Sequence, residues 1–247
     1  ISLQPDNYIM TTIADRLAVA QCRIAQAAQK CARLPHSIRL LAVSKTKPIE
    51  DIIAAYDAGQ RCFGENYVQE GVTKIESLKG THPDIEWHFI GPLQSNKTAL
   101  VAQHFDWMHT LSREKIAQRL NEQRPAHLAP LNVCIQINIS DEDTKSGIDA
   151  EQMLPLADSI SQLPHLQLRG LMAIPSATND IAQQTRELSE LKQLFDTLKQ
   201  HYPAVDTLSM GMSNDLDVAI ECGSTMVRIG SAIFGERDYG AKETTSN

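Results

Sequence analysis

An apolar run ends at a lysine in the segment Leu40-Leu41-Ala42-Val43-Ser44-Lys45-Thr46-Lys47-Pro48. The run has the length and composition of a buried strand, and Pro48 favours the first turn of a helix. Lys45 is therefore expected where a strand ends and a helix begins. A lysine in this position can lose its hydration and its proton and become a nucleophilic amine. Taken alone, the segment fits a solvated loop lysine better, so the rest of the sequence has to separate the two interpretations.

The alternation of strand and helix continues along the chain. An apolar stripe from Ile13 to Cys31 has the three- and four-residue spacing of a helix, which Pro35 ends. Ser95 and Ser112 are placed to cap two of the later helices. Strand-like runs are expected at residues 39–44, 61–64, 86–90, 106–110, 132–139, 167–174, 207–210 and 225–229.

Eight such units predict an α/β fold, a single (β/α)8 barrel of the TIM type with an additional N-terminal helix. Alternating strands and helices pair in parallel through right-handed crossovers, and about 210 residues suffice to close such a barrel. The rival is an open doubly wound sheet, but its GxGxxG fingerprint after the first strand is missing. No linker or repeat divides the 247 residues. Residues 10–240 are therefore expected to form one domain, with 1–9 and 241–247 as terminal extensions.

Composition narrows the class of protein. The chain is 42% hydrophobic and 21% charged, which is ordinary for a soluble protein. Its net charge of −7 argues against a general nucleic-acid binder, and it lacks both a secretory signal and the roughly 18 uninterrupted apolar residues of a membrane span. The five cysteines form no CxxC pair and no zinc spacing with histidine. A cytoplasmic monomer with reduced thiols and no bound metal is expected.

Two Gly/Ser turns follow the last two predicted strands. They are Gly211-Met212-Ser213-Asn214-Asp215 and Gly230-Ser231-Ala232. In this type of barrel the loops after strands seven and eight form the recurrent phosphate site, because glycine lets backbone N–H groups approach an anion and serine adds a hydroxyl donor. For the first turn alone, capping of a short helix by Ser213 and Asn214 is the better explanation. The two turns together favour a phosphate site.

Arg228 lies in the last predicted strand, in the sequence Val227-Arg228-Ile229. The two-residue period of a strand does not say which set of side chains points into the barrel. If Arg228 points inward, its guanidinium needs an acceptor, because an unpaired buried cation costs several kcal/mol. Glu65 and an acceptor on a ligand are the two candidates.

A lysine amine beside a phosphate site suggests two chemistries. One is a Schiff base with pyridoxal phosphate, and the other is a Schiff-base aldolase acting on a phosphorylated sugar. Both need a lysine pKa well below the ordinary value of about 10.4. Lys47 would help by charge repulsion unless it points into solvent. Lys145 is a second lysine near the same mouth, for which a surface position is the simpler reading, and His88 fits a hydrogen-bonded core histidine.

Six longer motifs occur in order over nearly the whole chain, from about Ile13 to Tyr239. They are LAVSKTKP at 41–48, FGENYVQE at 63–70, WHFIGPLQSNK at 87–97, GLMAIP at 170–175, SMGMS at 209–213 and GSTMVRIGSAIFG at 223–235. Together they resemble the pyridoxal-phosphate homeostasis proteins. These proteins are related to the barrel domain of alanine racemases, which has the type III fold of pyridoxal-phosphate proteins.

The resemblance implies that pyridoxal 5'-phosphate is carried as an internal aldimine on Lys45. Arg228 would face the pyridine nitrogen, where an arginine disfavours the ring protonation that makes the cofactor a strong electron sink. The other residues implied to bind the cofactor are Asn66, near the ring, Met212, and the phosphate-binding Ser213, Gly230 and Ser231.

A protein of pyridoxal-phosphate homeostasis with little or no catalysis of its own is therefore expected, and no catalytic residue is assigned. Its partners would be the cofactor and pyridoxal-phosphate-dependent apoenzymes. Related racemases use a tyrosine base supplied by another domain and subunit, and no such domain is expected here. A pyridoxal-phosphate-dependent amino-acid racemase and a cofactor-free Schiff-base aldolase are the alternatives, followed by a purely structural barrel.

Overall fold

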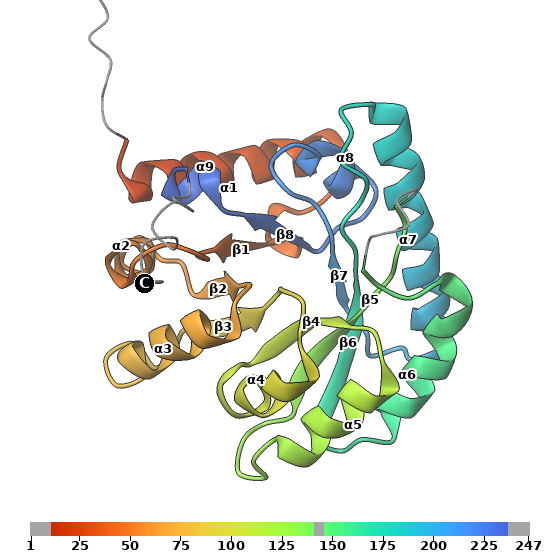
Figure 1. Ribbon diagram of the computed structural model, residues 1–247. Coiled ribbons are helices and arrows are strands. Elements are labelled where there is room, and N and C mark those ends of the chain that lie inside the picture. The colour runs from red at the N-terminus through yellow and green to blue at the C-terminus, as the bar shows by residue number, and fades with distance from the viewer. Residues whose placement is uncertain (1–10, 141–145, 237–247) are drawn as a thin grey trace, which may run out of the picture.

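The computed structural model describes residues 11–140 and 146–236, and in this part the chain forms a closed barrel of eight parallel strands (Figure 1). The strands follow one another around the barrel in sequence order, and β8 pairs with β1 to close it. Their bounds are β1 Arg39–Val43, β2 Cys62–Glu65, β3 Glu86–Phe89, β4 Trp107–Leu111, β5 Leu131–Gln136, β6 Leu166–Met172, β7 Thr207–Ser209 and β8 Met226–Ile229. The predicted (β/α)8 barrel is confirmed, and the open sheet is excluded.

Helices cover the outside of the barrel (Figure 1). Apolar side chains fill the layer between these helices and the strands, which explains why the strands read as nearly continuous apolar runs. The helices are α1 Ile13–Lys30, α2 Ile49–Asp57, α3 Val68–Leu78, α4 Thr98–His104, α5 Glu114–Gln123, α6 Met153–Ser161, α7 Ile181–His201, α8 Leu216–Glu221 and α9 Ser231–Phe234.

The additional N-terminal helix, α1, begins at a capping box in which the Thr12 side chain accepts from the Asp15 N–H. Its apolar stripe, which includes Leu17 and Ile24, is buried. The helix contacts α2, α8 and α9, so it covers the place where β8 meets β1. The predicted first helix is confirmed, and it joins the two ends of the barrel sequence.

Several predicted boundaries and caps are wrong. Ser95 begins a short 3-10 helix, Ser95–Lys97, and α4 follows it without a side-chain cap. Instead, the Ser95 carbonyl accepts from the Arg119 guanidinium at 3.0 Å. Arg113, not Ser112, holds the N-cap position of α5, and Glu114 in the first turn offsets the helix dipole. The fifth strand ends at Gln136 because the chain turns there to bridge Ile137 with Ile148.

Some of the remaining expectations fall outside the described residues. The predicted terminal extensions, 1–9 and 241–247, and Lys145 all lie there. All five cysteines are described, and each is a free thiol, as expected. No helix in residues 11–140 or 146–236 is long and apolar enough to cross a bilayer.

Candidate functional site

One cavity of about 350 Å³ opens at the carboxyl ends of the strands. Its lining comes from the ends of β1, β2, β3, β6 and β8 and from the turns after β7 and β8. The structure brings all the residues predicted to bind a cofactor into this single cavity. Its lining residues are Val43, Lys45, Asn66, Ile90, Met172, Ile174, Met212, Ser213, Asn214, Arg228, Gly230 and Ser231.

Lys45 lies in a tight turn directly after β1. The Lys47 N–H donates to the Ser44 carbonyl at 3.1 Å and closes this turn. Thr46 has a φ of 61°, which is uncommon for a β-branched residue. The carboxylate of Glu70 holds this conformation by accepting from the Thr46 N–H at 2.8 Å. The Lys47 ammonium donates to the Glu236 carbonyl oxygen, so its charge is held by the protein.

A buried ion pair supports the same turn from α3. Lys74 Nζ lies 2.6 Å from Glu65 Oε1 and donates to the Ser44 carbonyl at 2.8 Å. The Ser44 hydroxyl in turn donates to Glu65 Oε2 at 2.9 Å. Burial raises the pKa of Glu65 to about 7, although Lys74 opposes this. The backbone on both sides of Lys45 is therefore fixed by charged side chains, Ser44 by Lys74 and Thr46 by Glu70.

Arg228 points into the barrel and is 5% exposed. Its Nη1 donates to the Ser209 hydroxyl at 2.7 Å, and its Nη2 donates to the Ala173 carbonyl at 3.0 Å. Glu65, one of the two acceptors considered from the sequence, is not its partner, because Lys74 and Ser44 take up that carboxylate. Burial lowers the pKa of Arg228 to about 10. Arg228 thus brings a charge to the cavity wall while its protein acceptors are neutral.

The turn after β7 leaves its serine and asparagine at the cavity. Gly211 has a φ of 105°, and an added Cβ would lie 2.7 Å from the Ala219 Cβ. Asp215 holds the N-cap position of α8, and its Oδ1 accepts from the Met212 N–H at 2.7 Å. The alternative that Ser213 and Asn214 cap the helix is therefore wrong. After β8, Gly230 precedes α9, so the amino end of that helix also lies at the cavity.

Asn66 has an acceptor that the described part of the protein leaves unmatched. Its Oδ1 is buried and has no hydrogen-bond partner, which is costly for a buried polar atom. The backbone here is tightly packed, because a Cβ on Gly91 would lie 2.0 Å from the Asn66 carbonyl oxygen. Asn66 is thus fixed at the cavity wall with an acceptor that a ligand donor would satisfy.

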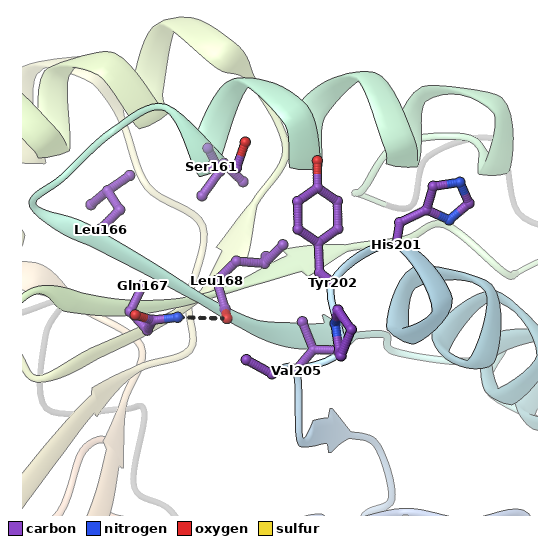
Figure 2. A pocket seen from close by; sticks show the side chains of 10 residues that line it. Ser161, Leu166, Gln167, Leu168, His201, Tyr202 and Val205 are labelled. Atoms are coloured by element: carbon purple, nitrogen blue, oxygen red, sulfur yellow. Dashed lines mark hydrogen bonds between the residues drawn. The ribbon is translucent and has the colours of Figure 1, made fainter.

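Two further cavities help to delimit the site. A smaller one of about 180 Å³ shares Asn66, Ile90 and Ile174 and extends the site towards Thr110 and Gln136 on β4 and β5. The other, of about 310 Å³, lies where β6 begins, among α6, β6 and the segment after α7 (Figure 2). Its lining includes no lysine, arginine or carboxylate. The cavity at the mouth is therefore the candidate site.

Sequence reasoning missed the apolar part of the site and the residues that support it. Met172, Ile90 and Ile174 line the cavity, but in the sequence they look like ordinary strand residues. The Lys74–Glu65 pair was also missed, although a lysine in the middle of an otherwise apolar helix stripe was a usable signal. His88 was read correctly: it is fully buried and hydrogen-bonded on both ring nitrogens.

The fold and the site define a TIM-type barrel protein whose ligand cavity lies at the carboxyl-terminal mouth. Residues 20–238 match the sequence profile of the alanine racemase N-terminal domain. Two curated relatives are named pyridoxal phosphate homeostasis protein. The Pasteurella multocida relative is 62% identical over 92% of this chain and 99% of its own length. The Escherichia coli K12 relative is 57% identical over 94% of this chain and 100% of its own length.

The chain therefore belongs to the alanine racemase N-terminal-domain family and, within it, to the pyridoxal phosphate homeostasis proteins. Solved structures agree with this assignment. PipY of Synechococcus elongatus, solved without pyridoxal phosphate, is 35% identical with a TM-score of 0.80 over 91% of this chain and 100% of its own. PipY was also solved with pyridoxal phosphate bound, and that structure has a TM-score of 0.78. Alanine racemase from Corynebacterium glutamicum, 16% identical with a TM-score of 0.67 over 91% of this chain and 61% of its own, shares the fold.

Proposed function

We propose that this protein binds pyridoxal 5'-phosphate covalently through Lys45 and acts in the intracellular homeostasis of that cofactor. The observation that carries the proposal is that Lys45, Arg228 and both Gly/Ser turns line one cavity of about 350 Å³. The names of the curated relatives and the structure of PipY with pyridoxal phosphate support it. When bound, this cofactor supplies an aldehyde that forms a Schiff base with an amine and a ring that can take up electrons.

The donors in the cavity fit an anionic ligand with a phosphate. Ser213 and Ser231 each offer a hydroxyl, and Gly230 allows backbone N–H groups to approach. The amino end of α9 adds a favourable field for a dianion. The unmatched Oδ1 of Asn66 fits a hydroxyl or another donor on the ring. Lys45 would be the attachment point, and the supported turn on which it lies would fix the position of its amine.

Arg228 favours a carrier over an enzyme. A guanidinium donates hydrogen bonds and cannot accept one, so it would keep a ring nitrogen beside it unprotonated. Without that proton the ring stabilises carbanions weakly, and turnover of amino acids would be slow. The described lining offers no second base either: apart from Lys45, it contains no histidine, tyrosine, cysteine, aspartate or glutamate. A racemase would need a base on each face of its substrate.

The proposal is tested by the visible spectrum of the purified protein, followed by borohydride reduction and peptide mass mapping. We expect a yellow protein whose pyridoxyl adduct maps to Lys45. Lys45→Ala should lose both signals, whereas Lys47→Ala, two residues away, should keep them. A colourless protein that takes up no added pyridoxal phosphate would refute the proposal and favour an aldolase. Rapid Lys45-dependent conversion of L- to D-alanine would favour a racemase.

We also propose that the protein is a cytoplasmic monomer that supplies the cofactor to pyridoxal-phosphate-dependent apoenzymes. A mouth open to solvent would allow the cofactor to leave for an acceptor. Incubating the loaded protein with a pyridoxal-phosphate-dependent apoenzyme should restore its activity faster than the same concentration of free cofactor. Equal rates would limit the role to storage. Light scattering would test the monomeric state.

A further inference from the structure

A chain of hydrogen bonds runs through the interior of the barrel, away from the cavity. Arg228 Nη1 lies 2.7 Å from Ser209 Oγ, which lies 2.9 Å from His109 Nδ1. His109 Nε2 lies 2.8 Å from His88 Nδ1, and His88 Nε2 lies 2.7 Å from Glu86 Oε1. Glu86 is the first residue of β3, at the opposite end of the barrel from the cavity. The chain therefore joins β8, β7, β4 and β3 across the interior.

The interior of the chain is closed to solvent. Ser209, His109 and His88 are fully buried, and only the terminal Glu86 side chain is substantially exposed, at 34%. Trp107 stacks on the His88 ring with a centroid distance of 5.0 Å. With water excluded, each polar atom depends on its neighbour in the chain.

The two ends of the chain fix the direction of every hydrogen bond in it. Arg228 can only donate, and an ionised Glu86 can only accept. Burial disfavours ionisation of Glu86, but its contacts with His88 and Arg39 hold its pKa at about 2. His88 must then donate from Nε2 and accept at Nδ1. His109 must also donate from Nε2 and accept at Nδ1, and the Ser209 hydroxyl donates to it.

This arrangement requires both histidines to be neutral and in the Nε2–H form. Burial lowers the pKa of each ring, and the nearby charges of Arg39 and Arg228 lower that of His109 further. An additional proton on the pair would make His109 a donor to Ser209. The Ser209 oxygen would then face two donors, His109 and Arg228, and could no longer pass its own hydrogen along the chain.

We propose that Ser209 and His109 are positioning residues that hold Arg228 charged and correctly oriented at the ring nitrogen of the bound cofactor. Ser209 and the Ala173 carbonyl fix the guanidinium at two nitrogens, 2.7 and 3.0 Å away. The chain uses neutral acceptors at this end and places the compensating carboxylate, Glu86, four hydrogen bonds away. This inference rests on the proposed function for the role of Arg228, but the direction of the chain does not.

The direction of the chain is tested on the wild-type protein without added cofactor. Protein labelled with 15N-histidine gives the tautomer and charge of each ring from its nitrogen chemical shifts. The two buried rings are assigned with the His109→Phe variant. We expect His88 and His109 to be neutral and protonated at Nε2 near neutral pH. A charged ring, or a proton on Nδ1 of either, would overturn the directed chain whether or not the protein binds pyridoxal phosphate.

The effect on the cofactor is tested with Ser209→Ala and a matched control, Cys134→Ala. Cys134 is fully buried on β5 and lies close enough to Arg228 for their charges to interact, but it is not part of the chain. Each substitution removes one heavy atom from the barrel interior. We expect Ser209→Ala to shift the absorption band of the bound cofactor and to weaken its binding about tenfold, the effect of one charge-assisted hydrogen bond.

Cys134→Ala should match the wild type in both measurements. If the two variants behave alike, Ser209 does not position Arg228 and the proposal fails. If the wild type binds no cofactor, the proposed function fails instead, and the histidine measurement still decides the direction of the chain. That measurement also decides it if Ser209→Ala does not fold.

Discussion

The Lys74 ammonium lies 2.6 Å from the Glu65 carboxylate, and this buried pair supports the turn that carries Lys45. Neither residue lines the cavity. Their contacts with Ser44 connect the end of β1 to α3. The position of the Lys45 amine therefore depends on charges that belong to the next helix along the chain.

Loss of the Lys74 charge is expected to destabilise the fold. Lys74→Met would leave Glu65 buried without its cation and the Ser44 carbonyl without its donor. Breaking a buried pair from one side typically costs about 3 kcal/mol or more. Urea unfolding would measure this cost. Lys79→Met is the control, because the Lys79 side chain is 64% exposed in its pair with Glu76 and should change stability by less than about 0.5 kcal/mol.

The stability of the protein should depend on pH through Glu65. Its folded pKa is raised from 4.5 to about 7, chiefly by burial. The folded state therefore keeps a proton that the unfolded chain releases in this range. The stability that Glu65 contributes is full below about pH 4.5 and is lost as the pH rises through about 7. Unfolding free energies across this window should fall for the wild type and vary less for Glu65→Gln. Equal slopes for the two proteins would contradict the assignment.

Gly91→Ala should displace Asn66. The added Cβ would lie 2.0 Å from the Asn66 carbonyl oxygen, so the backbone must shift. We expect a loss of about 1–3 kcal/mol in unfolding free energy and weaker binding of pyridoxal phosphate. Gly80→Ala is the matched control, because nothing lies within 4 Å of its added Cβ. Both variants are compared by thermal unfolding and by titration with the cofactor, and wild-type binding by Gly91→Ala would exclude a role for Asn66 in it.

Asp215→Ala should weaken recognition of the phosphate in particular. Asp215 accepts from the Met212 N–H at 2.7 Å and so shapes the turn that presents Ser213. Without this acceptor the turn should loosen, and affinity for pyridoxal 5'-phosphate should fall about tenfold, the scale of one charge-assisted hydrogen bond. Binding of unphosphorylated pyridoxal should change little.

Asp217→Ala serves as the control for that experiment. Asp217 is an exposed residue in the first turn of the same short helix, α8, so it removes the same charge without touching the turn. Equal losses for the phosphorylated and unphosphorylated ligands in Asp215→Ala would mean that the turn does not hold the phosphate.

The order of strands and helices, the closed barrel and the position of Lys45 after β1 followed from the sequence. Each depends on a local pattern: apolar runs mark strands, spacing of three and four marks helices, and alternation implies parallel pairing. The same local reading placed the two Gly/Ser turns at the mouth, because the connectivity of the barrel fixes where loops seven and eight lie. It failed for the Ser95 and Ser112 caps, where contacts with Arg119 and Glu114 decide the helix starts.

Only the tertiary structure decided which groups satisfy the buried charges. Arg228 binds Ser209 and the Ala173 carbonyl, and Glu65 binds Lys74. His109 and Ser209, which form one link of the interior chain, are 100 residues apart in sequence. A strand's two-residue period says that a side chain faces one side or the other, but not what it meets there. That choice depends on which polar groups the closed barrel brings within hydrogen-bonding distance once water is excluded.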